Sequence, residues 1–532
     1  MNALLMRINQ SAQRCGDASV VRTLDGNSNT ATALSWRQLW LQVEHTAASL
    51  RHHHVRCLGL MLANSAAWIV ADLAAQRAGI ALVPLPDFFT HQQLMHLCTR
   101  AGIDAILSDN PTRLQALGYD VEGTNAELDT ESLSMDEMFT QSICIGYNRT
   151  VAPVTLHDGT EKITFTSGTT GQPRGVCLGH ASQYRTALAL SDLLHSLHIR
   201  RHLCVLPLSV LLENVAGVWS TLLAEGELIV LPTPLTGLLG SSRFDPDQLA
   251  ASIDRYAPES MILLPEMLRA LVAWCTTRKR RFPSLKLVAV GGSRVPPPLS
   301  QQARACGLPV AQGYGLSECA SVVCLDTVRR GPLSDKHPLD TVGHCLPHWQ
   351  ISVADDQELI VSGQSFLGYL GEPRHDGPIF TGDLGRVDEQ GFVTVMGRKK
   401  NLLISSYGRN ISPEWVESEL CLQPEIAQAW VFGDAQPWCG AVLVARPGVC
   451  AQGINAAVLR ANSTLPDYAH IVHWLSADAP FCVENNQLTA NGRLRRDSLL
   501  QHYTTNIARL YQARCDDSTD YNQPDAQRSI HI

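Results

Sequence analysis

The stretch that points most directly to a chemistry is ITFTSGTTGQPRG, residues 163–175. An apolar run leads into hydroxyl residues and glycines, and Arg174 stands next to the last residue of the segment. Glycines let the backbone turn tightly and bring its N–H groups toward an anion, while the hydroxyl groups add donors. The composition favours a polyphosphate ligand, although a glycine- and threonine-rich surface turn would have the same composition. The segment does not fit the GxxxxGK pattern of the common phosphate-binding loop.

Five further segments follow this stretch along the chain. They are GGSRVP from Gly291, GYGLSE from Gly313, FTGDLGRVD from Phe380, GRKKNLLISSYGRNISPEWVE from Gly397 and LTANGRLRR from Leu488. In this order they resemble the motifs of the acyl-adenylate-forming (AMP-binding) superfamily, which includes acyl-CoA synthetases, peptide-synthetase adenylation domains and firefly-type luciferases. The resemblance covers most of the chain. It is nearest the branch of long-chain fatty acyl-CoA synthetases and acyl carrier protein ligases.

The resemblance implies ATP-dependent activation of a carboxylic acid. The carboxylate attacks the α-phosphate of ATP, which gives acyl-AMP and pyrophosphate, and a thiol then takes the acyl group while AMP leaves. The implied cofactors are ATP and Mg²⁺. The implied acceptor is CoA or the phosphopantetheine thiol of a separate acyl carrier protein. Catalysis of this kind depends on positioning the reactants and neutralising charge at phosphorus.

The resemblance also assigns roles to residues at the matching positions. The nucleotide-binding set is Thr166, Ser167, Gly168, Thr169, Thr170, Gly171, Arg174, Gly291, Gly292, Ser293, Gly313, Tyr314, Gly315, Ser317, Asp383 and Arg398. The catalytic set is Arg493, Glu318, Thr166 and Lys400, and Glu318 is the expected Mg²⁺ ligand. Tyr314 offers a flat face to adenine, and Asp383 can accept hydrogen bonds from the ribose. Without the family, Tyr314 could equally be a core residue and Glu318 an exposed glutamate at a helix start.

In the family, the small C-terminal domain rotates about a hinge residue, whose position here is Lys400. One orientation brings the position of Arg493 to the phosphate. The other brings the Gly408 region to the thiol tunnel.

Three positions depart from the family pattern. Arg174 and Arg493 stand where the family has lysine, and Val210 stands where it has histidine. Both arginines keep the charge, but a wide planar fork replaces a compact ammonium group. We expect a working enzyme that is slow or specialised. A catalytically weakened paralogue that binds nucleotide or acyl-adenylate is the alternative.

The segment SVLLENVAGVWS, residues 209–220, bears on the choice of acid. Amino-acid-activating relatives place an aspartate in this region to hold the substrate ammonium, and none is present here. A buried ammonium without a partner would be costly. Candidates for an acyl tunnel, or equally for ordinary core, are Val210, Leu211, Val218 and Trp219. We predict a hydrophobic, fatty carboxylic acid, and nothing singles out the aryl pocket of a luciferase-like oxygenase.

The elements that must position these motifs alternate along the chain. Short apolar runs and amphipathic helical runs follow one another from about residue 35 to 325, which predicts an α/β fold of mostly parallel sheets covered by helices. We expect an N-terminal domain over residues 1–399, with a β-rich subdomain at about 340–397. A small, mobile α+β domain over 400–514 and a disordered tail over 515–532 would follow.

Composition limits the class of protein. The 532 residues are 45% hydrophobic and 17% charged, and the formal net charge of −8 argues against nucleic-acid binding. Sixteen cysteines without CxxC spacing predict reduced thiols in a cytoplasmic protein, and no His/Cys cluster predicts a structural metal. The start lacks the apolar run of a signal peptide, and no apolar stretch is long enough for a membrane span.

Overall fold

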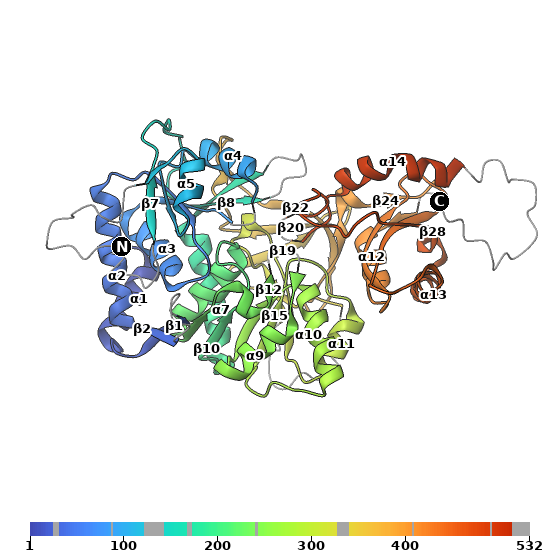
Figure 1. The fold of residues 1–532 in the computed structure, drawn as a ribbon, viewed down its shortest axis with the longest axis horizontal. Helices are drawn as coiled ribbons and strands as arrows, with labels where there is room; N and C mark the ends of the chain where they lie inside the picture. The colour runs from blue at the N-terminus through green and yellow to red at the C-terminus, as the bar shows by residue number, and fades with distance from the viewer. Residues whose placement is uncertain are drawn as a thin grey trace, which may run out of the picture.

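The structure is a computed structural model. It describes residues 1–24, 31–86, 89–121, 143–166, 173–239, 243–326, 340–406, 409–489 and 492–512. Figure 1 shows a large N-terminal domain and a smaller C-terminal domain, which meet near residue 400. The α/β fold class predicted from the sequence is confirmed.

A nine-stranded sheet forms the lower half of the N-terminal domain in Figure 1, in the order β18-β17-β16-β15-β14-β10-β11-β1-β2. Its strands are β1 (Ser19–Leu24), β2 (Ala31–Ser35), β10 (Arg201–Cys204), β11 (Glu227–Val230), β14 (Ser260–Leu263), β15 (Leu287–Val290), β16 (Val310–Tyr314), β17 (Cys324–Leu325) and β18 (His344–Cys345). The strands from β16 to β1 pair in parallel, and the pairs at the two edges are antiparallel. The sheet is therefore mixed at its edges and parallel at its centre.

An eight-stranded sheet has the order β21-β9-β8-β4-β3-β5-β7-β6. Its strands are β3 (Cys57–Met61), β4 (Ala81–Pro84), β5 (Ala105–Ser108), β6 (Asp120–Val121), β7 (Cys144–Tyr147), β8 (Thr160–Thr166), β9 (Arg174–Gly179) and β21 (Gly368–Tyr369). Strands β5, β3, β4 and β8 pair in parallel, whereas β8 and β9 form an antiparallel pair in which Thr166 lies opposite Arg174. Both ends of the glycine- and threonine-rich stretch are thus held in one sheet.

Helices cover and separate the two sheets. They are α1 (Ala3–Arg14), α2 (Trp36–His52), α3 (Ala66–Ala78), α4 (His91–Ala101), α5 (Pro111–Ala116), α7 (His180–Ser196), the π-helix η1 (Leu212–Trp219), α8 (Ser220–Leu223), α9 (Pro246–Tyr256), α10 (Pro265–Arg278) and α11 (Pro297–Ala305). Short 3₁₀ turns η2 (Thr233–Thr236) and η3 (Ser317–Cys319) and the small pair β12 (Leu238–Leu239) and β13 (Arg243–Phe244) complete this part.

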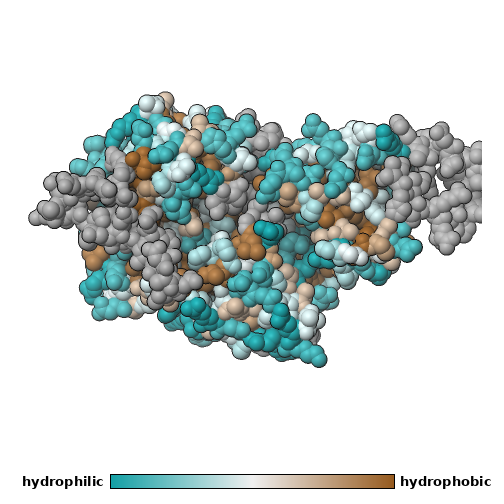
Figure 2. All heavy atoms as spheres, viewed as in Figure 1, coloured by the Kyte–Doolittle hydropathy of each residue, from teal (hydrophilic) through white to brown (hydrophobic). Residues whose placement is uncertain are grey.

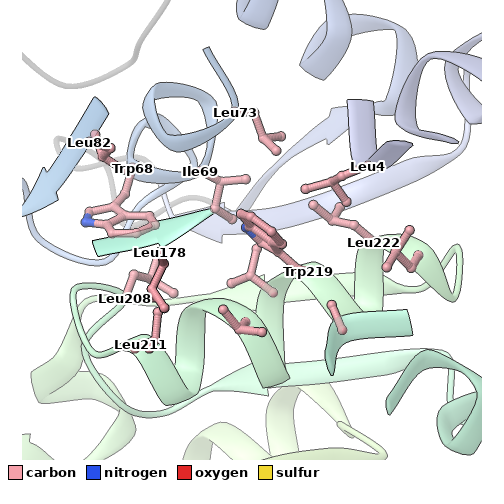
Figure 3. Packing of buried hydrophobic residues seen from close by; sticks show 14 of the residues in the cluster. Leu4, Trp68, Ile69, Leu73, Leu82, Leu178, Leu208, Leu211, Trp219 and Leu222 are labelled. Carbon is pink, nitrogen blue, oxygen red and sulfur yellow. The ribbon is translucent and has the colours of Figure 1, made fainter. Parts of the chain in front are cut away.

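Helix α3 is apolar on nearly every side because it lies in the middle of the N-terminal domain. Figure 3 shows Trp68 and Ile69 of this helix facing Leu208, Leu211 and Trp219, which come from the segment around η1. A helix that is hydrophobic all round belongs inside a large core. The same packing anchors η1, which borders the cavity described below.

A buried ion pair also holds η1. Lys162 on β8 and Asp72 on α3 are almost completely buried, and Lys162 Nζ lies 2.8 Å from Asp72 Oδ1. Asp72 Oδ2 accepts hydrogen bonds from Asn214 Nδ2 at 3.0 Å and from the Trp219 indole N–H at 2.9 Å. Breaking a buried pair of this kind would leave an uncompensated charge, at a cost of about 3–5 kcal/mol. Residues from β8, α3 and η1 are therefore tied together.

The β-rich subdomain and the C-terminal domain follow. The subdomain is an antiparallel sheet of β19 (Trp349–Val353), β20 (Glu358–Gly363), β22 (Ile379–Val387) and β23 (Val393–Arg398). The C-terminal domain contains η4 (Lys399–Asn401), β24 (Leu403–Ile404), β25 (Asn410–Ile411), α12 (Pro413–Cys421), β26 (Ile426–Phe432), β27 (Cys439–Ala445), α13 (Ala451–Asn462), η5 (Asp467–Ala469), β28 (Ile471–Ser476) and α14 (Arg496–Gln512). Its sheet has the order β26-β27-β28.

The C-terminal domain packs around two hydrophobic clusters of its own. One surrounds Val416 and Ile454, and the other surrounds Trp430 and Tyr503. Across the junction, the Arg269 guanidinium on α10 donates a hydrogen bond to the backbone carbonyl of Cys421.

Hydrophilic residues cover much of the face shown in Figure 2, with smaller groups of hydrophobic residues among them. Within the described ranges, no helix combines the length and the apolar character needed to cross a bilayer.

Candidate active site

A single cavity of about 1910 Å³ reaches from the junction of the two domains into the face of the nine-stranded sheet. Every predicted site residue within the described ranges lines it: Thr166, Arg174, Gly291, Gly292, Ser293, Gly313, Tyr314, Gly315, Ser317, Glu318, Asp383, Arg398, Lys400 and Arg493. The predicted residues Ser167, Gly168, Thr169, Thr170 and Gly171, and the Gly408 region, lie outside the described residues.

The cavity opens where parallel strands end. The segment Gly291–Ser293 directly follows β15, and Tyr314 is the last residue of the neighbouring strand β16. Two glycines are required by the backbone here. Gly292 has a φ of +94°, and a Cβ on Gly315 would overlap the backbone carbonyl of Ser321. In open α/β sheets, this carboxyl edge is the usual place for a ligand.

Tyr314, Asp383 and Arg398 form a hydrogen-bonded group on the cavity wall. The Tyr314 hydroxyl donates to Asp383 Oδ2 at 2.8 Å, and Arg398 Nε lies 2.8 Å from Asp383 Oδ1. Asp383 on β22 and Arg398 on β23 are cross-strand partners. Burial raises the pKa of Asp383, and Arg398 and Tyr314 oppose this shift. Each carboxylate oxygen keeps a further acceptor site, and Tyr314 keeps a ring face for a stacked base.

Glu318 is held by a residue that sequence reasoning missed. The Tyr369 hydroxyl donates to Glu318 Oε1 at 2.7 Å. The Arg174 guanidinium lies 3.6 Å from the centre of the Tyr369 ring and pairs with Glu372 at 2.6 Å. Arg174 was predicted to bind phosphate, and in this structure its guanidinium contacts β21 and the turn after it. Tyr369 reaches Glu318 only through the pairing of β21 with β9, which no sequence spacing indicates.

Arg493 lies at the junction of the two domains. Its Nε donates to the backbone carbonyl of Gly292 at 3.1 Å, although 201 residues separate them. Desolvation in the cavity and the neighbouring Arg398 lower the pKa of Arg493, whereas Asp383 and Glu318 oppose that shift. The guanidinium is thus close to the groups on the cavity wall.

Lys400 lies in η4, where the two domains join. Desolvation, followed by the nearby charge of Arg398, lowers the pKa of Lys400. Behind it, Arg496 makes two hydrogen bonds to Glu417, at 2.8 and 2.6 Å. Burial raises the pKa of Glu417 to about 7, against the effect of Arg496. This paired set lies beside the segment that would have to twist if the domains rotated.

The four residues proposed for an acyl tunnel separate into two kinds. Val210 and Leu211 line the cavity. Leu211 also belongs to the core cluster, whereas Val218 and Trp219 lie in that cluster without reaching the cavity wall, and the Trp219 indole N–H donates to Asp72 Oδ2. On η1, Leu212 and Ala216 also line the cavity, which the apolar pattern did not distinguish.

The fold gathers three potential metal ligands that are far from obvious in the sequence. His202, Cys204 and Glu213 are buried, and their ligand atoms lie within 4.8 Å of one another. The sequence had predicted no His/Cys cluster. However, His202 Nε2 and Glu213 Oε1 already contact each other at 2.8 Å. The group is therefore a hydrogen-bonded pair with an adjacent thiol.

Comparison with known proteins matches both domains. The family model described as AMP-binding enzyme matches residues 8–370, and the model described as AMP-binding enzyme C-terminal domain matches residues 400–514. A long-chain-fatty-acid–CoA ligase of Mycobacterium bovis is 30% identical over 253 residues, which are 42% of this chain and 41% of that protein. The match thus spans about two fifths of the length of that relative.

Other relatives match over more of their length. The 2-succinylbenzoate–CoA ligase of Bacillus subtilis is 26% identical over 75% of this chain and 80% of its own. A feruloyl-CoA synthase of Amycolatopsis is 26% identical over 77% of this chain and 82% of its own. The names of these relatives state different acids, so the comparison does not assign the chain to one substrate branch of the family.

Solved structures share the fold over both domains. The O-succinylbenzoate coenzyme A synthetase of Bacillus subtilis in complex with ATP and magnesium ion has a TM-score of 0.69 and 21% identity, and covers 92% of this chain and 98% of its own. An anthranilate CoA ligase in complex with anthranoyl-AMP has a TM-score of 0.76 and 15% identity, and covers 95% of this chain and 98% of its own.

Proposed function

The chain belongs to the AMP-binding enzyme family, and from this premise we propose that it is an AMP-forming ligase that joins a hydrophobic carboxylic acid to the thiol of CoA. The observation that carries the proposal is the shared cavity, which collects residues from each of the sequence motifs. Those residues come from β8, β15, β16, η3, β22, β23, η4 and the segment before α14.

The cavity wall suits a nucleotide. Tyr314 offers a ring face for adenine, and Asp383, fixed by Tyr314 and Arg398, has acceptor sites for the ribose hydroxyls. Glu318 fits Mg²⁺ because its carboxylate is a hard oxygen donor on the same wall, with Oε1 oriented by Tyr369. When bound, Mg²⁺ supplies positive charge to the phosphates.

Arg493 supports the adenylation half of the reaction. Its contact with the carbonyl of Gly292 sets the guanidinium at the end of β15, among the groups proposed to bind the nucleotide. A fixed positive charge there would attract the substrate carboxylate and offset the negative charge that grows on the α-phosphate during attack. The side chain transfers no proton, so an arginine can fill the role of the family lysine.

The acid is hydrophobic, because apolar side chains of η1 and the segment before it border the inner cavity. A fatty acid agrees with the name of one relative, and an aromatic acid agrees with the names of two others. We retain the fatty acid as the first choice. CoA is the acceptor proposed, since these relatives are named as CoA ligases. The fifteen cysteines in the described part of the chain are free thiols, which supports a cytoplasmic protein.

Pyrophosphate release with a panel of fatty and aromatic acids tests the proposal. Wild type should release pyrophosphate with at least one acid and form a CoA thioester from it. Arg493→Ala should lose on the order of 10²-fold or more in kcat/KM, and Arg493→Lys should retain activity. If a thioester forms with an acyl carrier protein but not with CoA, the proposed acceptor is wrong, while the proposed ligase activity is supported.

A weakened nucleotide-binding paralogue is the second candidate, favoured by the engagement of Arg174 with Glu372 and Tyr369 instead of an open loop end. If the chain is such a paralogue, wild type should release no pyrophosphate with any acid. Arg493→Lys should then either restore release or, like wild type, bind ATP without turnover.

A further inference from the structure

The inner end of the cavity carries a polar group in an otherwise apolar wall. The cavity runs along the sheet from Gly291, after the end of β15, to Leu287 at its start. Four residues of strand correspond to about 13 Å. At the inner end the wall includes Leu190, Leu193 and Leu194 of α7, together with His202 and Ser260. His202 and Ser260 are neighbours in the sheet, since they form a parallel register pair on β10 and β14.

A chain of hydrogen bonds fixes these side chains. Ser260 Oγ and His202 Nδ1 lie 2.9 Å apart, and His202 Nε2 lies 2.8 Å from Glu213 Oε1. Glu213 Oε2 accepts a hydrogen bond from the backbone N–H of Leu206 at 2.9 Å. His202 and Ser260 each expose 2% of their surface, and Glu213 exposes none. The three side chains form one rigid unit, which we name the Glu213–His202–Ser260 relay.

The fold makes room for this relay at Gly217. A Cβ at that position would overlap Glu213 Oε1 and would come within 2.7 Å of His202 Nε2. Gly217 lies in the π-helix η1, and short π-helical segments occur often at functional sites. Burying a histidine and a glutamate costs free energy, and well-packed apolar residues would usually be as stable. Stability alone therefore gives no reason for a polar relay at this place.

Counting donors and acceptors identifies the group that remains available. Both ring nitrogens of His202 and both oxygens of Glu213 have partners. The Ser260 hydroxyl has one donor and two acceptor sites, of which His202 uses one. If His202 donates to Ser260, the serine proton is left for a ligand; if His202 accepts, serine oxygen lone pairs are left. A ligand hydroxyl can complement either arrangement, because it both donates and accepts.

We propose that the enzyme selects carboxylic acids that carry a hydroxyl group at the end remote from the carboxylate, and that Ser260 is the residue that binds this hydroxyl. His202 and Glu213 are positioning residues that orient Ser260. This inference rests on the proposed function and narrows its substrate class. The acid must be long enough to extend from the end of β15 to its start, about 13 Å.

Matched pairs of acids test the inference. Each pair has one chain length and differs only in a terminal hydroxyl or methyl group, and an aryl pair with and without a ring hydroxyl is included. The measurement is kcat/KM for pyrophosphate release, together with the dissociation constant of each acid. Wild type should prefer the hydroxylated member of at least one pair by about tenfold or more, because a site built for a hydroxyl rejects the analogue that lacks it.

Ser260→Ala should remove this preference by weakening binding of the hydroxylated acid, with little change for its methyl partner. His202→Phe should do the same and so show that the relay orients the serine. Ser300→Ala is the matched control, because Ser300 is a buried serine on α11 outside the cavity wall. Its preference should equal that of wild type. Melting temperatures of all variants show whether each is folded.

Two results would overturn the inference. One is equal kcat/KM within every pair in wild type, and the other is a preference that survives in folded Ser260→Ala. Both leave the proposed ligase intact, because some acid is still activated. The ligase itself fails only if no acid in the panel supports pyrophosphate release.

Discussion

The hydroxyl of Tyr369 donates a hydrogen bond to the carboxylate of Glu318 across 2.7 Å. The backbone N–H of Phe366 donates to the Glu318 carbonyl at 2.8 Å, so the segment before β21 holds both the main chain and the side chain of this glutamate. Burial raises the pKa of Tyr369, with Glu318 as the second cause, so the phenol stays protonated and remains the donor. The free carboxylate oxygen of Glu318 is therefore presented in a defined direction.

Tyr369→Phe should weaken the use of Mg²⁺. The substitution removes one hydrogen bond to a charged group, which typically contributes about 1.5–3 kcal/mol, and part of that loss should appear in metal binding. We expect the Mg²⁺ concentration for half-maximal ATP binding to rise about threefold to tenfold. Magnesium titrations of ATP binding and of pyrophosphate release both measure it. Tyr468→Phe, on an exposed tyrosine of the C-terminal domain, serves as the control, and an unchanged midpoint in Tyr369→Phe would refute the positioning role.

Arg269→Ala should slow adenylation selectively. Arg269 donates to the carbonyl of Cys421 and so joins α10 to the C-terminal domain in the orientation that places Arg493 at Gly292. Without this contact, that orientation of the domains is less populated. A loss of about 1 kcal/mol in its free energy lowers its population roughly fivefold. Pyrophosphate release should fall by about that factor, whereas thioester formation from preformed acyl-adenylate should not. Arg278→Ala is the control on the same helix, because Arg278 pairs with Asp247 within the N-terminal domain. Equal losses in both half-reactions would count against the idea.

Gly217→Ala should destabilise the N-terminal domain. The added methyl would overlap the carboxylate of Glu213, and overpacking of this kind costs about 1–3 kcal/mol. Chemical denaturation followed by tryptophan fluorescence would measure the change, since Trp219 lies in the same helix. Gly453→Ala on α13 is the comparison, because the nearest atom to its added methyl would be a methyl carbon of Val449 at 3.1 Å and not a buried carboxylate. If Gly217→Ala were as stable as wild type, the Glu213 carboxylate could move aside without cost, and the prediction would be wrong.

Glu417 should make the stability of the C-terminal domain depend on pH. Its pKa is raised from 4.5 to about 7, so the folded state binds a proton more tightly than the unfolded state. The stabilising contribution is complete below pH 4.5 and is lost as the pH rises through about 7. The shift corresponds to about 3 kcal/mol. Urea denaturation at pH 5 and pH 8 should show this loss in wild type and not in Glu417→Gln. The exposed Glu389→Gln should behave as wild type does, and a Glu417→Gln variant with the full pH dependence would contradict the assignment.

The resemblance to the AMP-binding family supplied the predicted site residues, and those within the described ranges line one cavity. Backbone geometry explains why they meet. Glycines at Gly292 and Gly315 are required where strands end, and the carboxyl ends of parallel strands meet at one edge, so the motifs converge. Tyr369 could not be predicted from spacing, because its contact with Glu318 depends on a strand of two residues pairing across the sheet.

The residues that line the inner cavity could not be predicted from the hydrophobic pattern either. Leu211 and Trp219 look alike in an apolar segment, yet one lines the cavity and the other is bonded to Asp72. Leu211 lies just before η1 and Trp219 is its last residue, so the hydropathy of the segment alone does not say which of them reaches the cavity wall. The pairing of Glu213 with His202 joins η1 to β10, and the hydrophobic pattern does not indicate this contact.

The two hydrophobic clusters of the C-terminal domain are distinct from those of the N-terminal domain, although Leu422 at the end of α12 packs against one of the N-terminal clusters. We therefore expect the two parts to melt separately, so that a single melting temperature would not describe the whole chain. Calorimetry should resolve two heat-absorption peaks. A bound adenylate that touches both parts would raise the lower peak toward the upper one, so the gap between the peaks would report how firmly a ligand joins them.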